Sequence, residues 1–504
     1  MAAAGEGAGP AAPRTYGNWR RPTTAGVISQ LGFVTSLMLL GGVIVVVLCT
    51  LISYVLAIVI AVVLALVMTP LALKDRHGRT MLVRMTSRLA WRQTVKRGAH
   101  IYRSGPLGRT DQGSCQLPGL AASSDLSEAQ DSYGRPFGLL TYPNSRHHVV
   151  VLTCDADGAA LVDQDQVDIW VAYWGHWLSS LATEPGLVGA SVTVESAPDS
   201  GLRLRGEVHS NLDPDAPQLA KDMLAEVLES YPASSAQIST RIALTYSGAA
   251  RNGHPRRTVA EMAVDLGNRL PGLTEGLSMT GAGAARPLSA EELSEAVRIA
   301  YDPSVSTLVE ESRSTGGSGL TWSDAGPAGA EEAWDHYRHE TATSVTWMMS
   351  EAPRGEVLSS VLTGLLVPHP DIARKRVTLL YRPHDPSAAA RIVEMDRKNA
   401  RLKANQSHIA KAMDDIAVRS ADQTAQEEAA GAGVVRFSML VTATVADRAA
   451  GPRARAAVDN LAAPARIKLR VVTGSQAAAF AACLPIGLVL PLHLTIPSSV
   501  RDNL

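Results

Sequence analysis

The stretch AQISTRIALTY, residues 236–246, decides how the larger part of this chain folds. Its polar and apolar side chains alternate, which is typical of a β-strand with one buried face. A second predicted strand, VVRFSMLVTATV at residues 434–445, comes at the corresponding place in the second half. Each is the third strand of a series in which strands and helices alternate. The sequence therefore predicts two α/β units that repeat one order of elements.

The remaining elements of the two units follow from the same patterns. In the first unit a strand is predicted at 137–142, and the series that follows has strands at 148–154, 186–196, 236–246 and 278–288, with helices at 162–183 and 216–230, from Thr258 and from Ser289. In the second, strands are predicted at 343–351, 376–383, 434–445 and 465–472, with helices at 355–366, 386–430 and 453–461. Both series read as βαβ, helical insertion, βαβ, which is the order of a split βαβ or ferredoxin-like sandwich. We therefore expect an α+β protein with two tandem ferredoxin-like units and helical insertions.

The predicted boundaries divide the chain into seven parts. These are a flexible tail at 1–25, a two-helix hairpin at 26–73, a basic helix at 74–103, a first α/β unit at 104–303, a Gly/Ser-rich linker at 304–333, a second α/β unit at 334–487 and a C-terminal tail at 488–504.

Two local signals strengthen the helix predictions in the first unit. Thr258 with Glu261, and Ser289 with Glu292, have the spacing of capping boxes. Aromatic residues recur at helical spacing on the predicted helix 162–183, namely Trp170, Tyr173, Trp174 and Trp177. Such a stripe is either a stacking platform for a ligand or, more often, the face of a helix that packs on a sheet.

The N-terminal hairpin is predicted from a long uncharged run. No residue between Arg21 and Lys74 is charged, and these 52 residues are too many for a single membrane span of roughly 20. Two transmembrane helices near 26–48 and 51–73 fit the run; the alternative is a buried pair of core helices. Basic residues flank both ends, so the positive-inside rule predicts a multi-pass protein of the bacterial cell membrane with both termini in the cytoplasm.

A basic helix follows this run. Its cations recur every four residues, at Arg84, Arg88, Arg92 and Lys96, while Leu82, Met85 and Leu89 form another face. The pattern fits a helix that lies on the anionic inner leaflet of a membrane, so these four residues are the predicted membrane-surface site. A basic helix surrounded by solvent is the alternative.

Charge and composition exclude several classes of function. The first 103 residues carry twelve Lys or Arg and two acidic residues, whereas the rest carries 35 basic and 46 acidic residues. A net acidic body argues against direct nucleic-acid binding, which needs a concentrated basic face. Four widely spaced cysteines, with no CxxC pair, suggest neither a zinc site nor a disulfide framework.

No motif for catalysis or cofactor binding stands out. None of the eight lysines follows a glycine, so a standard P-loop is absent from the sequence. GAGAAR at 281–286 has Arg286 where a dinucleotide fingerprint needs its third glycine. WDHYRHE at 334–340 lacks the second histidine of an HExxH motif, and an exposed helix of mixed charge is the simpler interpretation. We expect no catalytic, metal or cofactor residues and a protein that is not an enzyme.

The long polar insertion at 386–430 has the pattern of a protruding helical hairpin. Apolar residues such as Met395, Leu402 and Ile416 are scattered among many charges, with a break near KANQSH. It predicts either an arm for assembly or docking, or an appendage surrounded by solvent.

Several longer stretches resemble an actinobacterial family of two-helix membrane proteins associated with conjugation-type (type IV) secretion. They are RRP before the hairpin, HIYRSGPLGR, LVDQDQVDIWVAYWGHWL, GLVGASVTVE, WDHYRHE, RKRVTLLYRPHDP and GSQAAAFAACLPIG. The hairpin looks like the small inner-membrane subunit of those systems, and residues 105–487 look like the ATPase-free N-terminal region of their assembly ATPase. The resemblance implies a membrane-anchored, oligomeric scaffold that docks a separately encoded P-loop ATPase and other secretion subunits at the cytoplasmic face. It implies no catalytic residue.

Two other functions stay open from the sequence. One is a core membrane component of a type VII-like secretion system, which shares two N-terminal spans and α/β domains. The other is a membrane-bound enzyme with an unrecognised site, which would need a cleft with convergent polar groups.

Overall fold

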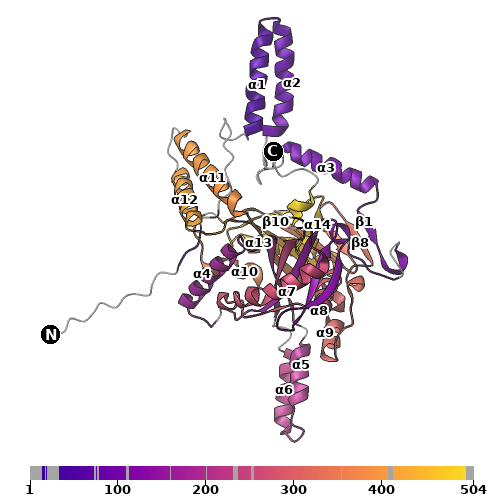
Figure 1. The fold of residues 1–504 in the computed structure, drawn as a ribbon. Helices are drawn as coiled ribbons and strands as arrows, with labels where there is room; N and C mark the ends of the chain where they lie inside the picture. The colour runs from indigo at the N-terminus through magenta and orange to yellow at the C-terminus, as the bar shows by residue number, and fades with distance from the viewer. Residues whose placement is uncertain are drawn as a thin grey trace, which may run out of the picture.

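A single β-sheet of 13 strands organises the chain (Figure 1). The computed structural model describes residues 14–17, 19, 33–72, 75, 79–108, 113–158, 161–199, 201–230, 236–250, 255–353, 355–406 and 412–494. The main path of the sheet runs β1-β8-β9-β10-β12-β11-β5-β6-β4-β3-β2, with β13 beside β10 and β7 beside β4. All of these pairs for which a register is given are antiparallel.

The strands divide into two similar central groups of four and five outer strands, which are β1, β8 and β9 at one end of the sheet and β3 and β2 at the other. Their bounds are β1 Ile101–Arg103, β2 Asp125–Gln130, β3 Pro136–Tyr142, β4 His147–Asp155, β5 Leu187–Pro198, β6 Ala236–Ser247, β7 Ala284–Pro287, β8 Gly329–Glu332, β9 Tyr337–His339, β10 Ala342–Glu351, β11 Arg374–Pro383, β12 Val435–Val445 and β13 Lys468–Val471. In the first group the order is β7-β4-β6-β5, and in the second it is β13-β10-β12-β11. Both groups thus place their fourth, first, third and second strands side by side.

The two groups join edge to edge, which the sequence did not predict. β5 pairs with β11 from Lys375 opposite Ser196 to Tyr381 opposite Ala190. An isolated group would leave both of these edges with unpaired backbone N–H and C=O groups, and pairing satisfies them. The predicted fold, a transmembrane hairpin followed by two tandem ferredoxin-like units with helical insertions, is therefore wrong: the chain forms one continuous, antiparallel sheet.

Helices cover the sheet and project from it. Their bounds are α1 Phe33–Thr50, α2 Tyr54–Ala72, α3 Met81–Lys96, α4 Gln164–Ser180, α5 Leu202–Asn211, α6 Gln218–Ser230, α7 Val259–Glu275, α8 Ala290–Tyr301, α9 Ser306–Ser314, α10 Thr363–Leu366, α11 Pro386–Gln406, α12 Ala412–Ala429, α13 Gly451–Ala462 and α14 Gln476–Ala482. One face of the sheet packs on α4 and α7 in the first half and on α10 and α13 in the second. The other face packs on α8, α14 and the chain that follows α14.

The two capping boxes are confirmed. Thr258 and Ser289 each accept a hydrogen bond from the backbone of a glutamate three residues on, and each glutamate accepts one in return. The aromatic stripe of α4 packs on the sheet in part: Trp177 is buried and stacks on Trp174 at 5.0 Å between ring centroids, whereas Tyr173 is 44 % exposed. The first half thus follows its local signals closely.

WDHYRHE does not form the expected exposed helix. Residues 337–339 form β9, which pairs with β8 and β10, and His339 is only 1 % exposed. The backbone hydrogen bonds of this short strand come from neighbouring strands in the sheet, a long-range effect that the local mixture of charges does not reveal.

The predicted linker at 304–333 contains α9 and β8, and β8 belongs to the sheet.

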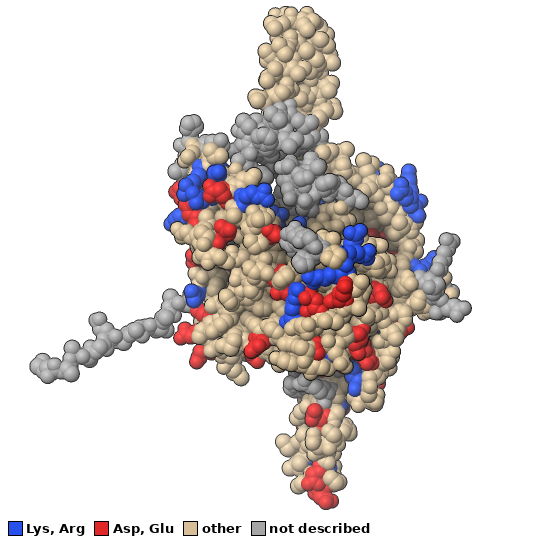
Figure 2. All heavy atoms as spheres, in the orientation of Figure 1, with Lys and Arg blue, Asp and Glu red and all other residues tan. Residues whose placement is uncertain are grey.

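The helices α1 and α2 form an antiparallel pair that projects from the body (Figure 1). Gly42 lets them approach closely, since a Cβ there would lie 2.4 Å from Leu64 Cδ1. Apolar side chains on the pair are widely exposed, with Leu51 at 81 % and Leu66 at 73 %. Figure 2 shows no Lys, Arg, Asp or Glu on the visible face of this projection. Exposed apolar area of this extent marks an interaction surface.

The prediction of a membrane-spanning hairpin is wrong for the described residues, where no helix is both long and apolar enough to cross a membrane. At 1.5 Å per residue, the 18 residues of α1 and the 19 of α2 extend about 27 and 28 Å, against a hydrocarbon core of about 30 Å. The predicted multi-pass location in a bacterial cell membrane is wrong for the same reason. Residues 26–32 and 73 of the predicted hairpin, and most of the tail 1–25, lie outside the described part of the chain.

Candidate functional site

The centre of the sheet carries polar side chains on one face and apolar side chains on the other. On β11 the residues Val377, Leu379 and Tyr381 pack into the apolar cores beside α4, α10 and α13. The alternate residues point to the opposite face, because successive strand residues point to opposite sides. That face collects Ser191, Thr193, Glu195, Ser344, Thr346, Arg374, Arg376, Thr378, Leu380, Arg382, Arg436, Ser438, Leu440, Thr442 and Thr444. We call this set the polar face.

The C-terminal segment, residues 474–491, covers the polar face. Gln476 is fully buried, and its amide bonds the backbone of Thr346 through both its oxygen and its nitrogen. The hydroxyl of Tyr142 donates to the Ile486 carbonyl at 2.9 Å, and that of Thr245 donates to the Gly487 carbonyl at 2.7 Å. These contacts bind the segment to both halves of the sheet.

Gly487 is required where the segment crosses the first half. Its φ is 62°, in the left-handed region, and a Cβ there would lie 2.5 Å from both Thr245 Oγ1 and Val149 Cγ1. The LPIG sequence is thus explained by packing: Leu484 and Ile486 fill the core, and the glycine permits close approach to β6 and β4.

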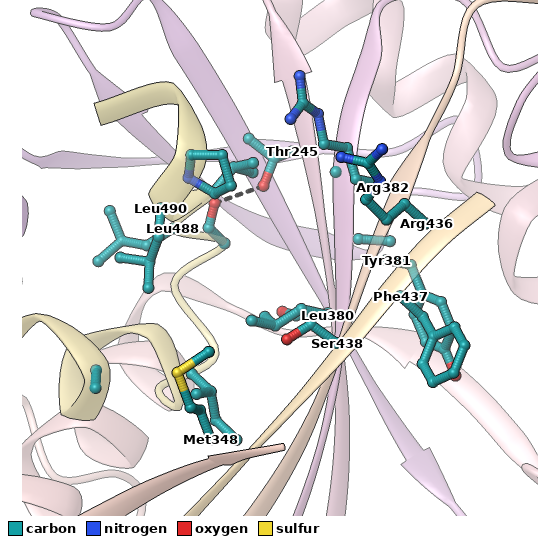
Figure 3. Close-up of a pocket in the computed structure, with 18 of the residues that line it drawn as sticks. Thr245, Met348, Leu380, Tyr381, Arg382, Arg436, Phe437, Ser438, Leu488 and Leu490 are labelled. Atoms are coloured by element: carbon teal, nitrogen blue, oxygen red, sulfur yellow. Dashed lines mark hydrogen bonds between the residues drawn. The ribbon is translucent and has the colours of Figure 1, made fainter. Parts of the chain in front are cut away.

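A pocket of about 350 Å³ lies between the polar face and this segment (Figure 3). Leu380, Leu440 and Met348 contribute to its floor, and Leu488 to Leu490 form the wall that the C-terminal segment provides. Its size is that of a small-molecule site, and its lining is mostly apolar with few polar groups, as such sites usually are. β5 and β11 meet here, so both halves of the sheet build the pocket.

Two arginines lie at one end of this pocket. Arg382 on β11 and Arg436 on β12 are directly opposite one another in the register, and both line the cavity. Figure 3 shows both side chains at the end of the pocket away from Met348. Like charges directly opposite on neighbouring strands destabilise a sheet. Arg436 makes no ion pair within the part of the chain that the structure describes.

A buried ionic cluster lies further along the same face. Glu195 on β5 bonds Arg241 on β6 at 3.2 Å and Arg374 on β11 at 2.9 Å. Burial alone would raise the pKa of Glu195, but Arg374, Arg376 and Arg241 lower it to about 2. This carboxylate stays ionised and ties the two halves together.

Arg376 lies within this cluster with incomplete hydrogen bonding. It is 1 % exposed, and neither terminal nitrogen of its guanidinium has a hydrogen-bond partner among the described residues. Its guanidinium lies over the ring of Phe480 in the C-terminal segment, 4.7 Å from the centroid. A cation–π contact of this kind compensates part of the lost hydration.

Two buried groups that contact the polar face, His339 and Cys483, are poor acid–base catalysts at neutral pH. Burial lowers the pKa of His339 to about 4, although its hydrogen bond to the Tyr301 carbonyl opposes the shift. Burial also raises the pKa of the Cys483 thiol, which disfavours the reactive thiolate. The described residues contain no group of three or more His, Cys, Asp or Glu that could hold a metal ion.

The predicted membrane-surface residues all lie on α3, outside this pocket. Arg84, Arg88, Arg92 and Lys96 are exposed, so the helix and its basic stripe are as the spacing indicated. Arg84 pairs with Asp75 at 3.4 Å and lines a second pocket with Arg79 and Arg470. The other three form no ion pair within the described ranges. That α3 contacts a membrane surface through these residues stays a prediction.

Sequence reasoning missed Arg382, Arg436 and Ser191. One signal was available: in RVTLLYR, residues 376–382, an alternating strand places Arg376, Thr378 and Arg382 on one side. No local pattern indicates that Arg436 faces Arg382, because that pairing joins strands separated by the whole α11–α12 insertion.

Comparisons with known proteins cover little of the chain. The family model of a domain of unknown function (DUF8461) matches residues 24–82, which contain α1, α2 and the first residues of α3. No curated protein matches. The sheet and its pocket lie outside the matched residues.

Proposed function

We propose that this protein is a non-enzymatic scaffold of a conjugation-type secretion machine, which binds a separately encoded P-loop ATPase. The type of machine and the type of partner come from the resemblance of stretches such as RKRVTLLYRPHDP and GSQAAAFAACLPIG. The observation that carries the binding role is the projecting hairpin α11–α12, which leaves the body of the protein as a separate arm (Figure 1).

The arm has its own internal contacts. Ala389, Val393 and Ala400 of α11 and Ala421 of α12 are nearly fully buried, which lets the helices pack closely. Asp422 of α12 accepts from Arg401 of α11 at 2.9 Å. Such contacts hold the hairpin in one shape before any partner arrives, which reduces the ordering cost of binding.

Apolar residues remain on the outside of this arm. Met395 is 63 % exposed and Leu402 is 51 % exposed. They are seven residues apart, about two helical turns, and so lie on one face of α11. Ile416 of α12 is exposed to 54 %. A rigid helix that presents spaced apolar side chains is suited to insertion into a groove of another protein.

Substitution of Met395 and Leu402 by glutamate tests this role. The tagged protein is recovered from its native host in mild detergent, and the proteins that accompany it are quantified by mass spectrometry. The unaltered chain should recover a P-loop ATPase, and the double variant should recover about tenfold less, because two charges in an apolar groove oppose binding.

The matched control is a double variant on another projecting helix. Leu219 and Met223 of α6 are exposed to 72 % and 60 % and lie one turn apart. Leu219→Glu with Met223→Glu should leave recovery of the ATPase unchanged. Equal recovery with the α11 variant, or no ATPase with the unaltered chain, would contradict the proposal.

A further inference from the structure

The pocket under the C-terminal segment has a polar end and an apolar end. Antiparallel register places its floor residues in rows across β5, β11 and β12. The first row contains Arg382 and Arg436. The second contains Ser191, Leu380 and Ser438, and the third ends with Leu440 beside Met348.

The polar character falls from row to row. Rows are two residues apart, so Arg436 and Leu440 are separated by about 13 Å along β12. Over that distance the lining changes from two guanidinium groups, through two hydroxyls, to Leu440 and Met348. Leu488 and Leu490 supply apolar side chains from the opposite wall. A bound molecule must therefore be polar at one end and apolar at the other.

Ser191 gives independent support for a ligand. It is 4 % exposed, it lines the pocket, and its hydroxyl has no hydrogen-bond partner among the described residues. The next residue on the same face, Thr193, bonds Thr378 at 3.1 Å, so the row beyond is satisfied. A buried hydroxyl without a hydrogen-bond partner is unfavourable. An oxygen of a bound molecule removes that cost.

The paired arginines select the charge of the ligand. Arg382 and Arg436 are opposite one another, and Arg436 has no ion pair within the described residues. An anion between two guanidinium groups relieves their repulsion and accepts charge-assisted hydrogen bonds from both. A cation at this end would add to the repulsion.

We propose that this pocket binds an anionic amphiphile: a carboxylate or phosphate head held by Arg382 and Arg436, followed by an apolar chain over Leu380, Leu440 and Met348. The site joins the two halves of the sheet and the C-terminal segment, so its ligand would stabilise that junction. The inference concerns the pocket alone and does not depend on the proposed partner of α11–α12.

Calorimetric titration of the full chain with three single-chain probes tests the charge preference. Decanoate and decyl phosphate should bind, and the phosphate should bind more tightly if two charges engage both arginines. Decyltrimethylammonium should bind at least about tenfold more weakly. Equal binding of the cation and the two anions, or no binding of either anion, overturns the proposal.

Two variants test whether the anions bind in this pocket. Arg436→Glu changes an exposed residue and should weaken both anions about tenfold or more, whereas Arg88→Glu on α3, the matched charge reversal, should change nothing. Ser438→Trp fills the second row and should abolish binding of both anions. Circular dichroism and thermal unfolding check that each variant is folded. If Arg436→Glu is folded and binds decanoate as before, the proposal fails.

Adsorption to the apolar α1–α2 pair is excluded by mapping. A photoreactive diazirine analogue of decanoate is cross-linked to the chain and the labelled peptides are identified by mass spectrometry. Labels on the peptides that contain Leu380, Leu440 or Leu488 support the site. Labels confined to residues 33–72 show that the amphiphile binds the projecting pair, and overturn it.

Discussion

The two faces of the central strands differ in the chemical character of their side chains. One face of β11 presents Val377, Leu379 and Tyr381 to continuous apolar cores. The other presents Arg376, Thr378 and Arg382 to a cover that the C-terminal segment supplies. The polar face therefore contributes something other than apolar packing. Its ions join the halves, and its pocket provides a place for a ligand.

The largest expected effect tests whether the ionic cluster joins the halves. Glu195→Gln leaves Arg241 and Arg374 buried near one another without their common carboxylate. We expect a loss of about 3–5 kcal/mol in the free energy of unfolding, the range for breaking a buried pair on one side. Urea unfolding followed by circular dichroism measures it.

A second substitution sharpens this test. Arg374→Met in the Glu195→Gln background removes one uncompensated cation and should restore part of the lost stability. A loss of under about 1 kcal/mol for Glu195→Gln alone would mean that the junction depends on apolar packing.

An intermediate effect comes from the pH dependence of His339, whose ring contacts Ser344 of the polar face. The pKa of His339 is about 4 in the folded protein and its ordinary value is 6.5, so the unfolded chain binds more protons between these values. The contribution is complete above about pH 6.5 and is lost as the pH falls toward 4. Unfolding in urea at about pH 7.5 and about pH 5 should differ by about 2 kcal/mol from this group.

His339→Gln separates this group from the others. Glutamine can donate to the Tyr301 carbonyl and accept from the Ser344 hydroxyl, as His339 does. The variant should show a smaller difference between the two pH values, although His147, whose pKa burial also lowers to about 4, keeps part of it. If the free energy of unfolding differs between the two pH values by the same amount in the variant, groups other than His339 cause the pH dependence.

The smallest expected effect compares neighbouring residues on opposite faces. Thr378→Val removes the hydrogen bond to Thr193 and should cost about 1 kcal/mol in the free energy of unfolding. Val377→Thr puts a hydroxyl into an apolar core and should cost about 2 kcal/mol. Differential scanning calorimetry of both variants measures the order, and a reversed order would contradict the division of the two faces.

Local signals were sufficient for many elements of the fold. Alternation identified the strand that contains residues 236–246, the strand at 434–445 was predicted as well, and capping boxes identified the starts of α7 and α8. The helical break near residue 405 identified the α11–α12 arm. These features depend on neighbours a few residues apart, so they are visible in the sequence.

Where distant parts of the chain decide the structure, the local sequence patterns were misleading or absent. The uncharged run predicted membrane spans, yet the two helices of that run in the described chain are too short to cross. WDHYRHE looked like a surface helix because its charges are dense, whereas β8 and β10 supply backbone partners that make it a strand. The candidate pocket went unpredicted for the same reason.

By itself, the sequence determined the type and order of most strands and helices, since hydrophobic period, caps and breaks act over a few residues. That the net acidic body does not bind nucleic acid directly stays a prediction from its charge. Only the tertiary structure decided that β5 and β11 join two groups of strands into one sheet, and that Arg382, Arg436 and Ser191 meet beneath residues 474–491. The physical reason is that strand edges pair through backbone groups, which are the same in every residue and leave no mark in the sequence.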